Sequence, residues 1–181
     1  MAQTRRGTAE TKVTQSAKIM QTIFWDCRGI LLIDFEERNT TVNGAYYASI
    51  LHKLRDAIKD KRWGMLSRGF RLIHDNAPVH TAAVTKAAVK KFGFEEIEHL
   101  PYSPVQATSD CYLFSKLKTD LWGKKFNNDE VKTVVMGHFA DKEPEYFLKG
   151  IELLVHRCEK CVEIMGDYIE KNRKVILFLS P

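Results

Sequence analysis

The spacing of apolar residues changes several times along this sequence, and these changes constrain the fold more than any other feature. Residues 17–24, 30–35 and 70–73 are apolar stretches of strand length, whereas other segments repeat apolar residues every three or four positions. Short runs are typical of strands, and the longer period is typical of amphipathic helices. The order strand, strand, helix, strand, helix, strand and then helices predicts an α/β fold with a helical C-terminal third.

Turn and capping residues indicate where several elements begin. Residues 26–29, Asp-Cys-Arg-Gly, predict the turn of a β-hairpin, because glycine supplies the positive φ that tight turns need. A continuous helix is predicted over residues 77–92, with Pro78 in its first turn, where no backbone N–H is required. Ser109 is placed to cap a further helix over residues 110–122.

Length and composition exclude several classes of protein. The chain has 181 residues, of which 44% are apolar and 28% charged, as expected for a single globular domain. Its longest uncharged apolar runs, 29–33 and 175–179, are far shorter than the ~18 residues that suggest a membrane span. No apolar segment of a signal peptide follows the basic N-terminus. We therefore expect no membrane partner and a reducing compartment.

Basic residues are concentrated in one stretch. Lys and Arg outnumber Asp and Glu by 28 to 23, which gives a net charge of +5 and favours an anionic partner. Between positions 53 and 71, the acidic residues are only Asp56 and Asp60. This stretch forms either a phosphate-facing surface or an ordinary solvated helix face. The candidates for phosphate contact are Lys53, Lys59, Lys61, Arg62, Arg68 and Arg71.

Two aspartates stand where α/β proteins often bind ligands. Asp75 follows the apolar run 70–73, and Asp110 follows a proline-containing loop at the predicted start of a helix. In open α/β sheets, ligands bind beyond the carboxyl ends of the strands. Two carboxylates brought together there suit Mg²⁺ or Mn²⁺, which prefer oxygen ligands and also bind phosphate oxygens. On pattern alone, each aspartate is also consistent with an ordinary capping role.

Longer motifs surround both aspartates. His74-Asp75-Asn76-Ala77-Pro78 is followed by His80, and thirty-four residues separate Asp75 from Asp110. With these motifs and this spacing, the chain resembles the catalytic domain of mariner-type transposases of the Tc1/mariner superfamily, from about residue 16 to residue 171. The other matching segments are Lys18-Ile19-Met20, Phe24-Trp25-Asp26, Ile30–Asp34, Gly44–Tyr47, Pro101-Tyr102-Ser103-Pro104, Ser109–Phe114, Phe126–Val131 and Gly150-Ile151 through Gly166-Asp167-Tyr168.

The resemblance implies a fold, a reaction and a set of site residues. The fold is ribonuclease-H-like, a mixed sheet flanked by helices, and the reaction is cleavage of DNA at transposon ends and its joining to a target. Asp75 and Asp110 match the second and third members of the family's aspartate triad, which makes them the implied catalytic and metal-binding residues of a two-metal Mg²⁺ or Mn²⁺ site. His80 is a candidate for orienting the loop after Asp75.

The resemblance also implies partners and a location. DNA is the expected partner, full-length relatives act as homodimers, and the expected location is the nucleus. No small-molecule substrate is expected. The organisation we expect is a variable segment over residues 1–15, a partial catalytic domain over 16–171 and an unrelated tail over 172–181.

The sequence departs from the family pattern in two places. The family's first aspartate lies on its opening strand, in a Thr-Gly-Asp-Glu context upstream of every residue matched here. Because that strand is central, we expect an incomplete sheet in which the strands near 20–24 and 70–73 lack a partner. Before Asp110, Val105-Gln106-Ala107-Thr108 stands where the family usually has Asp-Leu-Ala-Pro, and the loss of proline predicts a less rigid loop.

Together these features predict an inactive remnant of a transposase catalytic domain. A two-metal site for phosphoryl transfer normally needs at least three acidic side chains, and the matched residues supply two. The alternative is a non-catalytic module that dimerises or binds DNA without sequence preference, for which the basic stretch is the motivation.

Overall fold

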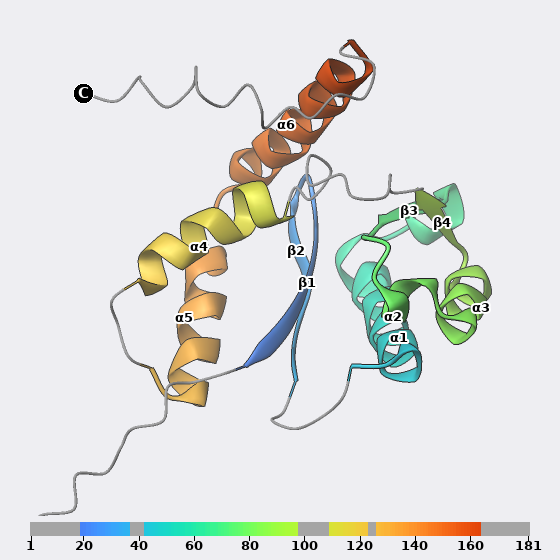
Figure 1. The fold of residues 1–181 in the computed structure, drawn as a ribbon, viewed down its shortest axis with the longest axis horizontal. Coiled ribbons are helices and arrows are strands. Elements are labelled where there is room, and N and C mark those ends of the chain that lie inside the picture. Colours follow the sequence, from blue (N-terminus) through green and yellow to red (C-terminus); the bar gives the residue numbers. More distant parts are fainter. Residues whose placement is uncertain (1–18, 37–41, 98–108, 123–125, 164–181) are drawn as a thin grey trace, which may run out of the picture.

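A β-hairpin and a long helix open the described part of the chain (Figure 1). Strands β1 (Met20–Asp26) and β2 (Gly29–Glu36) pair antiparallel, with Gly29 at φ 136° in the predicted turn. Helix α1 (Gly44–Lys61) follows, and the Asn43 side chain caps it by accepting a hydrogen bond from the backbone N–H of Tyr46. The computed structural model describes residues 19–36, 42–97, 109–122 and 126–163.

A second, parallel pair of strands is joined by helices. Strand β3 (Phe70–Ile73) pairs in parallel with β4 (Phe94–Ile97), and the connection contains α2 (Pro78–Thr81) and α3 (Ala83–Phe92). The prediction of one continuous helix over residues 77–92 is therefore wrong. The chain is extended at Ala82, with φ −57° and ψ 143°.

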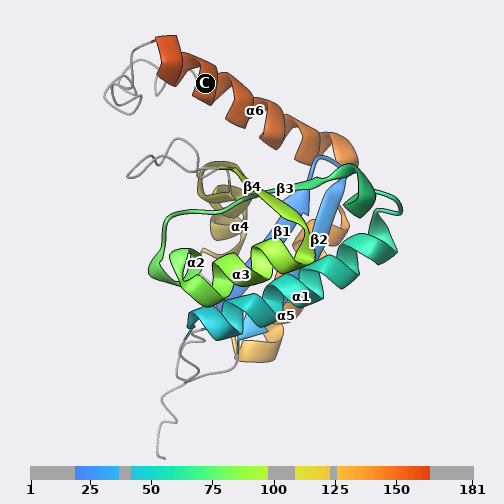
Figure 2. The ribbon, with the colours of Figure 1, turned by 90° about the vertical axis from the view of Figure 1, so that its right-hand side faces the viewer.

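Side-chain contacts explain the break between α2 and α3. The Thr85 hydroxyl is fully buried and donates a hydrogen bond of 2.6 Å to the carbonyl of Val79 across the break. Local hydrogen bonds of this kind compete with the helical pattern. Figure 2 shows α3 lying alongside α1, and both helices cover the β3–β4 pair.

The last third of the described chain is helical, as predicted. A π-helical segment, Ser109–Leu113, leads into α4 (Phe114–Leu121). Helices α5 (Asn128–Ala140) and α6 (Pro144–Glu163) follow, and α6 extends beyond the rest of the described molecule in both views (Figures 1 and 2). The segments expected to be variable or unrelated, 1–15 and 172–181, and the loop 105–108 lie outside the described residues.

Within the described residues, the strands form two separate pairs rather than one sheet. Strand β1 pairs with β2 alone, and β3 pairs with β4 alone. One edge of β1 and one edge of β3 therefore have no strand partner in this part of the chain. This agrees with the expected incomplete sheet, because those are the two edges that a central strand would join.

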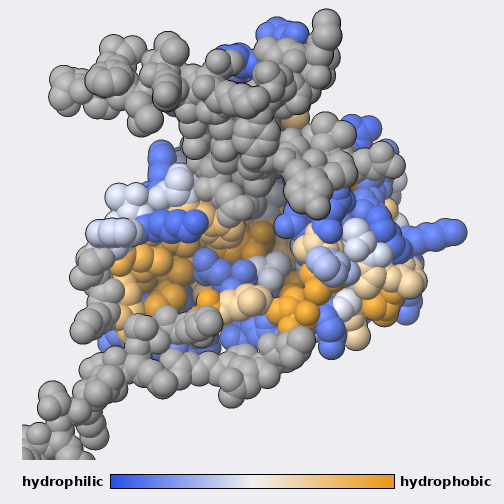
Figure 3. Space-filling model, in the orientation of Figure 1, coloured by the Kyte–Doolittle hydropathy of each residue, from blue (hydrophilic) through white to orange (hydrophobic). Residues whose placement is uncertain are grey.

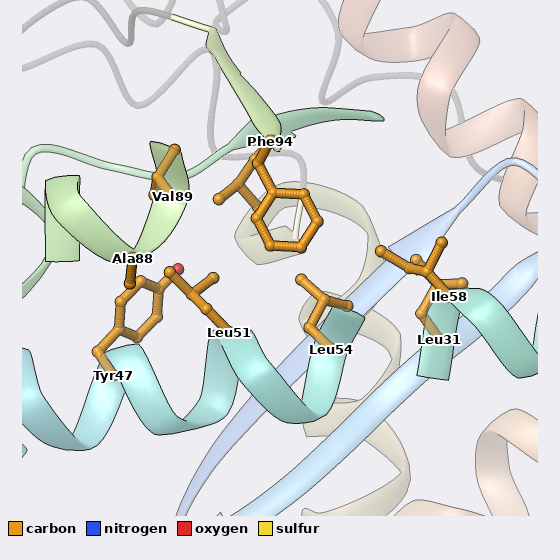
Figure 4. Close-up of a cluster of buried hydrophobic side chains, with 9 residues drawn as sticks. Leu31, Tyr47, Leu51, Leu54, Ile58, Ala88, Val89 and Phe94 are labelled. Carbon is orange, nitrogen blue, oxygen red and sulfur yellow. The ribbon is translucent and has the colours of Figure 1, made fainter. Parts of the chain in front are cut away.

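Two hydrophobic clusters pack on opposite sides of the hairpin. The α1 cluster joins α1, α3, β3 and β4 to one face of the hairpin (Figure 4), and the α4 cluster joins α4, α5 and α6 to the other. The buried residues of the α1 cluster are Leu31, Tyr47, Leu51, Leu54, Ile58, Leu72, Ala88, Val89 and Phe94. Those of the α4 cluster are Leu113, Leu117, Val135, Phe139 and Phe147.

An irregularity in the hairpin sets which side chains face each cluster. Phe24 pairs with Leu32 but Trp25 pairs with Ile30, so Leu31 has no partner in the register. Such bulges change the direction of neighbouring side chains. Leu31 and Leu32 both pack on the α1 cluster, whereas Trp25 and Ile30 pack on the α4 cluster.

The surface is mixed in character. On the face drawn in Figure 3, hydrophobic side chains gather over the α4 and α5 region, and hydrophilic residues lie between and around them. No helix in the described part of the chain combines the length and apolar character needed to cross a bilayer.

Candidate active site

Asp75 lies just beyond the carboxyl end of β3, as the sequence predicts, and its side chain is 63% exposed. Its Oδ1 accepts hydrogen bonds from the backbone N–H of Ala77, at 3.0 Å, and from His80 Nδ1, at 2.6 Å. The first of these is a local turn contact typical of aspartate. The second comes from α2, and because an ionised carboxylate only accepts, Nδ1 of His80 carries the proton. His80 therefore orients the Asp75 carboxylate.

A layer of buried polar groups supports this histidine. The rings of His74 and His80 stack with their centroids 4.8 Å apart and their planes 6° apart. His74 Nδ1 lies 3.1 Å from the Tyr47 hydroxyl, and His74 Nε2 lies 3.0 Å from Glu96 Oε1. Glu96 also accepts a hydrogen bond from Lys86. The position of His80 is thus set by residues from α1, α3 and β4 and by His74, which directly follows β3.

The electrostatics of this layer determine its proton arrangement. Burial raises the pKa of Tyr47, so its hydroxyl stays protonated and donates to His74 Nδ1. His74 Nε2 then carries the proton that is donated to Glu96. Burial is the main reason why the pKa of His74 lies below its usual value, and this keeps the ring neutral. A hydrogen bond from Lys86 is the main cause that lowers the pKa of Glu96.

Asp110 lies in the π-helical segment that precedes α4. Single π-helical turns are frequent at functional sites. Ser109 is the first residue of this π-helical segment rather than the cap of α4, whose N-cap position is Leu113, and its hydroxyl accepts a hydrogen bond of 3.1 Å from Trp25 Nε1. This contact ties the segment to the hairpin.

Two carboxylates of the hairpin are engaged elsewhere, whereas the buried Glu36 Oε1 accepts no hydrogen bond from the described residues. Asp26 binds Arg62 in the turn region, and Asp34 accepts hydrogen bonds from the Tyr46 hydroxyl and from Lys53 Nζ. Among the described residues, no three His, Cys, Asp or Glu side chains gather into a group that could hold a metal ion. The exposed Asp75 carboxylate offers the oxygen ligands that a hard cation such as Mg²⁺ prefers. It would be one of several ligands of such an ion.

Two of the basic candidates hold the hairpin against α1. Arg62, only 12% exposed, donates from Nε and Nη2 to Asp26 at 2.7 and 2.8 Å. Lys61 Nζ donates to the carbonyls of Ile30 and Leu31. Burial raises the pKa of Asp26, but hydrogen bonds from Arg62 and nearby backbone N–H groups, with the Arg62 charge, outweigh it and hold the pKa below its usual value. Arg62 therefore contributes little to the exposed basic surface.

The remaining basic candidates are exposed and lie on α1, β3 and the turn between them. Lys53 pairs with Asp34 at 2.7 Å, Lys59 with Asp56 at 3.7 Å, and Arg71 with Glu95 at 3.3 Å. Arg68 ends the short 3₁₀ turn before β3 and is exposed. The Lys59 and Arg71 pairs are exposed on both sides and contribute about 1 kcal/mol or less, so they do not prevent these two side chains from meeting phosphates, whereas the partner of Lys53, Asp34, is only 12% exposed.

Comparisons with known proteins place this geometry in a family. The family model described as transposase, partial DDE domain, matches residues 4–68. The mariner Mos1 transposase of Drosophila mauritiana is 36% identical over 156 residues, which are 84% of this chain and 45% of that protein. The crystal structure of the Mos1 catalytic domain superposes with a TM-score of 0.77 at 35% identity, covering 83% of this chain and 75% of that one. The chain belongs to the mariner transposases.

Other relatives extend the comparison of this mariner chain. The human histone-lysine N-methyltransferase SETMAR is 28% identical over 155 residues, covering 84% of this chain and 23% of that protein. A pre-cleavage Mos1 transpososome gives a TM-score of 0.80 at 32% identity and covers 92% of this chain. The predicted ribonuclease-H-like class is confirmed. The chain spans about half the length of the Mos1 transposase and about a quarter of the human protein.

The mariner motifs identify the two carboxylates and His80, but not the residues that hold them in position. Tyr47 stands in a matching segment without an assigned contact, and Glu96 and Lys86 lie outside the motifs. An acidic residue within a predicted strand is the signal that could have found Glu96, because a partly buried carboxylate needs a partner. Trp25 and Gly150 also stand in matching segments, but their contacts were not predictable because they join segments far apart in the sequence.

Proposed function

We propose that this chain carries two of the carboxylates of a mariner transposase active site, Asp75 and Asp110. The observation that supports this most directly is the position of Asp75 at the end of β3, held by a hydrogen bond from His80 in a mariner fold. Asp110 follows at the mariner spacing, on the segment that opens α4. Both residues therefore act as metal ligands in this proposal.

The proposed chemistry is metal-dependent cleavage and joining of DNA. Structures of the Mos1 catalytic domain with Mg and with Mn support the use of a divalent cation. When bound, such cations activate the attacking oxygen and stabilise the leaving oxygen in phosphoryl transfer. The residues of this chain would hold the cation through Asp75 and Asp110, and His80 would keep the Asp75 carboxylate in one orientation.

We further propose that these 181 residues alone do not complete a working site. The support is the divided sheet, in which β1 and β2 form one pair of strands and β3 and β4 form another. The matched motifs also supply two acidic side chains, whereas a two-metal site normally needs at least three. A two-metal site with a missing ligand binds its ions weakly and positions them poorly, and a misplacement of about 1 Å costs roughly 100-fold in rate.

DNA is the proposed partner, and the nucleus is the proposed location. Mos1 has been solved as a paired-end complex and as a strand transfer complex, which supports both DNA binding and action as a homodimer. In this chain the proposed phosphate contacts are the exposed Lys53, Lys59, Arg68 and Arg71.

The decisive test combines metal binding with nuclease activity. We expect Mn²⁺ to raise the melting temperature of the 181-residue chain but not that of Asp75→Asn, because a ligand that binds only the folded state stabilises it. The matched control is Asp60→Asn, at an exposed carboxylate of α1, which should keep the full shift. Equal shifts in parent and Asp75→Asn would contradict the proposed metal site.

Nuclease activity tests the second part of the proposal. We expect no nicking of supercoiled plasmid by the chain with Mn²⁺ above that of Asp75→Asn. Nicking that disappears in Asp75→Asn but persists in Asp60→Asn would show that the site is complete.

The second candidate function is non-catalytic DNA binding, favoured by the exposed basic residues near α1. Such binding depends on phosphate contacts, so its affinity should fall steeply between about 50 and 200 mM salt. We expect the triple variant of Lys59, Arg68 and Arg71 to alanine to bind duplex DNA more weakly regardless of its sequence. Unchanged binding by this variant in a gel-shift titration would place the DNA surface elsewhere.

A further inference from the structure

The segment that carries Asp110 is tied to the hairpin at its first residue. Trp25 Nε1 donates a hydrogen bond to Ser109 Oγ across 84 positions of the sequence, at 3.1 Å. Trp25 comes directly after the irregularity in the β1–β2 register and packs against Phe147 of α6, with ring centroids 6.2 Å apart. The direction of the Trp25 side chain is therefore set before it meets Ser109.

A second tie holds the same segment from the other side. The Tyr112 hydroxyl donates to the backbone carbonyl of Tyr146 at 2.9 Å, and the two rings lie with centroids 5.0 Å apart. Lys116 Nζ lies 5.3 Å from the Tyr112 ring and 5.1 Å from the Tyr146 ring. A cation over aromatic rings adds a favourable electrostatic contact. Tyr112 is thereby fixed to the start of α6.

One glycine of α6, Gly150, packs against both Trp25 and Tyr112. Gly150 is buried, and a Cβ placed on it would lie 2.8 Å from Tyr112 Cδ1 and 2.9 Å from Trp25 Cη2. Those contacts are too short for any side chain, so only glycine permits this approach of α6 to the two aromatic rings. By contrast, a Cβ at Gly137, in the middle of α5, would meet nothing within 4 Å.

We propose that Trp25, Ser109, Tyr112 and Gly150 are positioning residues that hold Asp110 in place for metal binding. This inference rests on the proposed function, in which Asp110 is a metal ligand. Asp110 lies one residue after Ser109 and two before Tyr112, so its backbone is held on both sides. Metal ligands must stay within about 0.5 Å of their productive geometry, and supporting contacts supply that precision. Helix α6 thus serves the site without providing a ligand.

The mildest test removes one hydroxyl. Ser109→Ala deletes the acceptor for Trp25, and Ser109→Thr retains it. Loss of supporting contacts around metal ligands typically weakens affinity about 10–100-fold. We expect Ser109→Ala of the full chain to bind Mn²⁺ at least about 10-fold more weakly, measured by the electron paramagnetic resonance signal of free Mn²⁺, and Ser109→Thr to restore the affinity. Parent-like Mn²⁺ binding by Ser109→Ala would overturn the proposal.

Two helical glycines provide a matched pair. We expect Gly150→Ala to weaken Mn²⁺ binding about as much as Ser109→Ala, because Tyr112 and Trp25 must move, and Gly137→Ala to bind like the parent. Circular dichroism verifies that each variant is folded. If Gly150→Ala is unfolded, Ser109→Ala decides the question alone. Equal Mn²⁺ affinity of the folded glycine variants would overturn the role of α6.

Amide hydrogen exchange separates this inference from the proposed metal site. Without metal, we expect the amides of residues 109–113 to exchange slowly in the parent and in Ser109→Thr, and faster in Ser109→Ala. If the parent binds no Mn²⁺ but shows this pattern, the metal site fails while the positioning contacts stand. If exchange over 109–113 is the same in the parent and Ser109→Ala, the positioning contacts are refuted whether or not Mn²⁺ binds.

Discussion

The α1 cluster and the α4 cluster share the hairpin but support the two aspartates in different ways. Asp75 belongs to the α1 side, where it follows a parallel strand pair over a core of nine buried residues and is held by His80, whose ring stacks on His74. Asp110 belongs to the α4 side, where five buried residues are described and half-buried aromatic residues do much of the packing. The two halves of the candidate site thus rest on different cores, and the hairpin alone belongs to both.

Core truncation provides the largest test of this comparison. Leu54 of the α1 cluster is 0% exposed and Leu117 of the α4 cluster 2% exposed, so truncation to alanine removes the same group from each. We expect Leu54→Ala and Leu117→Ala each to lower the free energy of unfolding by about 2–5 kcal/mol. Because the hairpin joins both clusters, one cooperative transition should shift in each variant. Urea unfolding followed by circular dichroism and tryptophan fluorescence measures this.

The number of unfolding transitions shows whether the two clusters unfold together or independently. Separate transitions in the two signals, with only one of them shifted by Leu117→Ala, would mean that the clusters unfold independently. Asp60→Ala, at an exposed position, is the control and should stay within about 0.5 kcal/mol of the parent.

The Arg62–Asp26 pair tests how firmly α1 holds the hairpin. Asp26→Asn should cost about 1.5–3 kcal/mol at neutral pH, since it weakens two charge-assisted hydrogen bonds at groups only 12% and 19% exposed. The folded-state pKa of Asp26 lies below its unfolded value, so this stability is present above about pH 4 and is lost as pH falls through the folded pKa. Unfolding of parent and variant from pH 7 to pH 2 should therefore converge.

A control and a contradicting result follow for the ion pair. Asp60→Asn, at an exposed carboxylate of α1, is the control at neutral pH and should stay within about 0.5 kcal/mol of the parent. If the difference between parent and Asp26→Asn did not shrink in acid, the stabilisation would not come from the ionised carboxylate.

The approach of α1 to α3 gives a smaller effect. A Cβ at Gly44 would lie 2.8 Å from Ala82 Cβ and 2.8 Å from Val84 Cγ1. Gly44→Ala should therefore cost about 1–3 kcal/mol by overpacking, whereas Gly137→Ala in open space should stabilise by about 0.5–1 kcal/mol. Thermal unfolding of the two variants compares them directly, and equal stabilisation by both would show that α1 and α3 are not so close.

The smallest expected effect concerns the start of α5, on the α4 side. The Asn127 side chain accepts hydrogen bonds from the N–H groups of Asp129 and Glu130, and the Glu130 carboxylate accepts one from the Asn127 N–H. Asn127→Ala should cost about 1 kcal/mol, while Asn127→Ser should retain most of the stability. Equal loss in both variants, measured by thermal unfolding, would show that capping is not the reason.

Local patterns predicted the elements that depend on neighbouring residues. The hairpin turn and the strand over residues 70–73 are both found as expected. Each is decided by side-chain period or by a contact within three or four positions. The break at Ala82 was not predictable in this way, because it depends on a buried Thr85 hydroxyl and on packing against α1.

Contacts between distant segments decided what the charged and polar residues do. Six basic residues looked alike in the sequence, yet Arg62 and Lys61 bind the hairpin while Arg68 remains at the surface. The sequence predicts that Ser109 caps a helix, but the Ser109 hydroxyl accepts a hydrogen bond from Trp25, which lies 84 positions away in the sequence. Spacing in sequence carries no information on such encounters.

By itself, the sequence determined the order of the elements, the family and the two aspartates at mariner spacing, since these depend on periodicity and on short motifs. The tertiary structure alone decided that His80 orients Asp75, that the hairpin divides two cores, and that α6 closes on Trp25 and Tyr112 at a glycine. The physical reason is that packing and hydrogen bonds act over a few ångströms in space, whatever the distance along the chain.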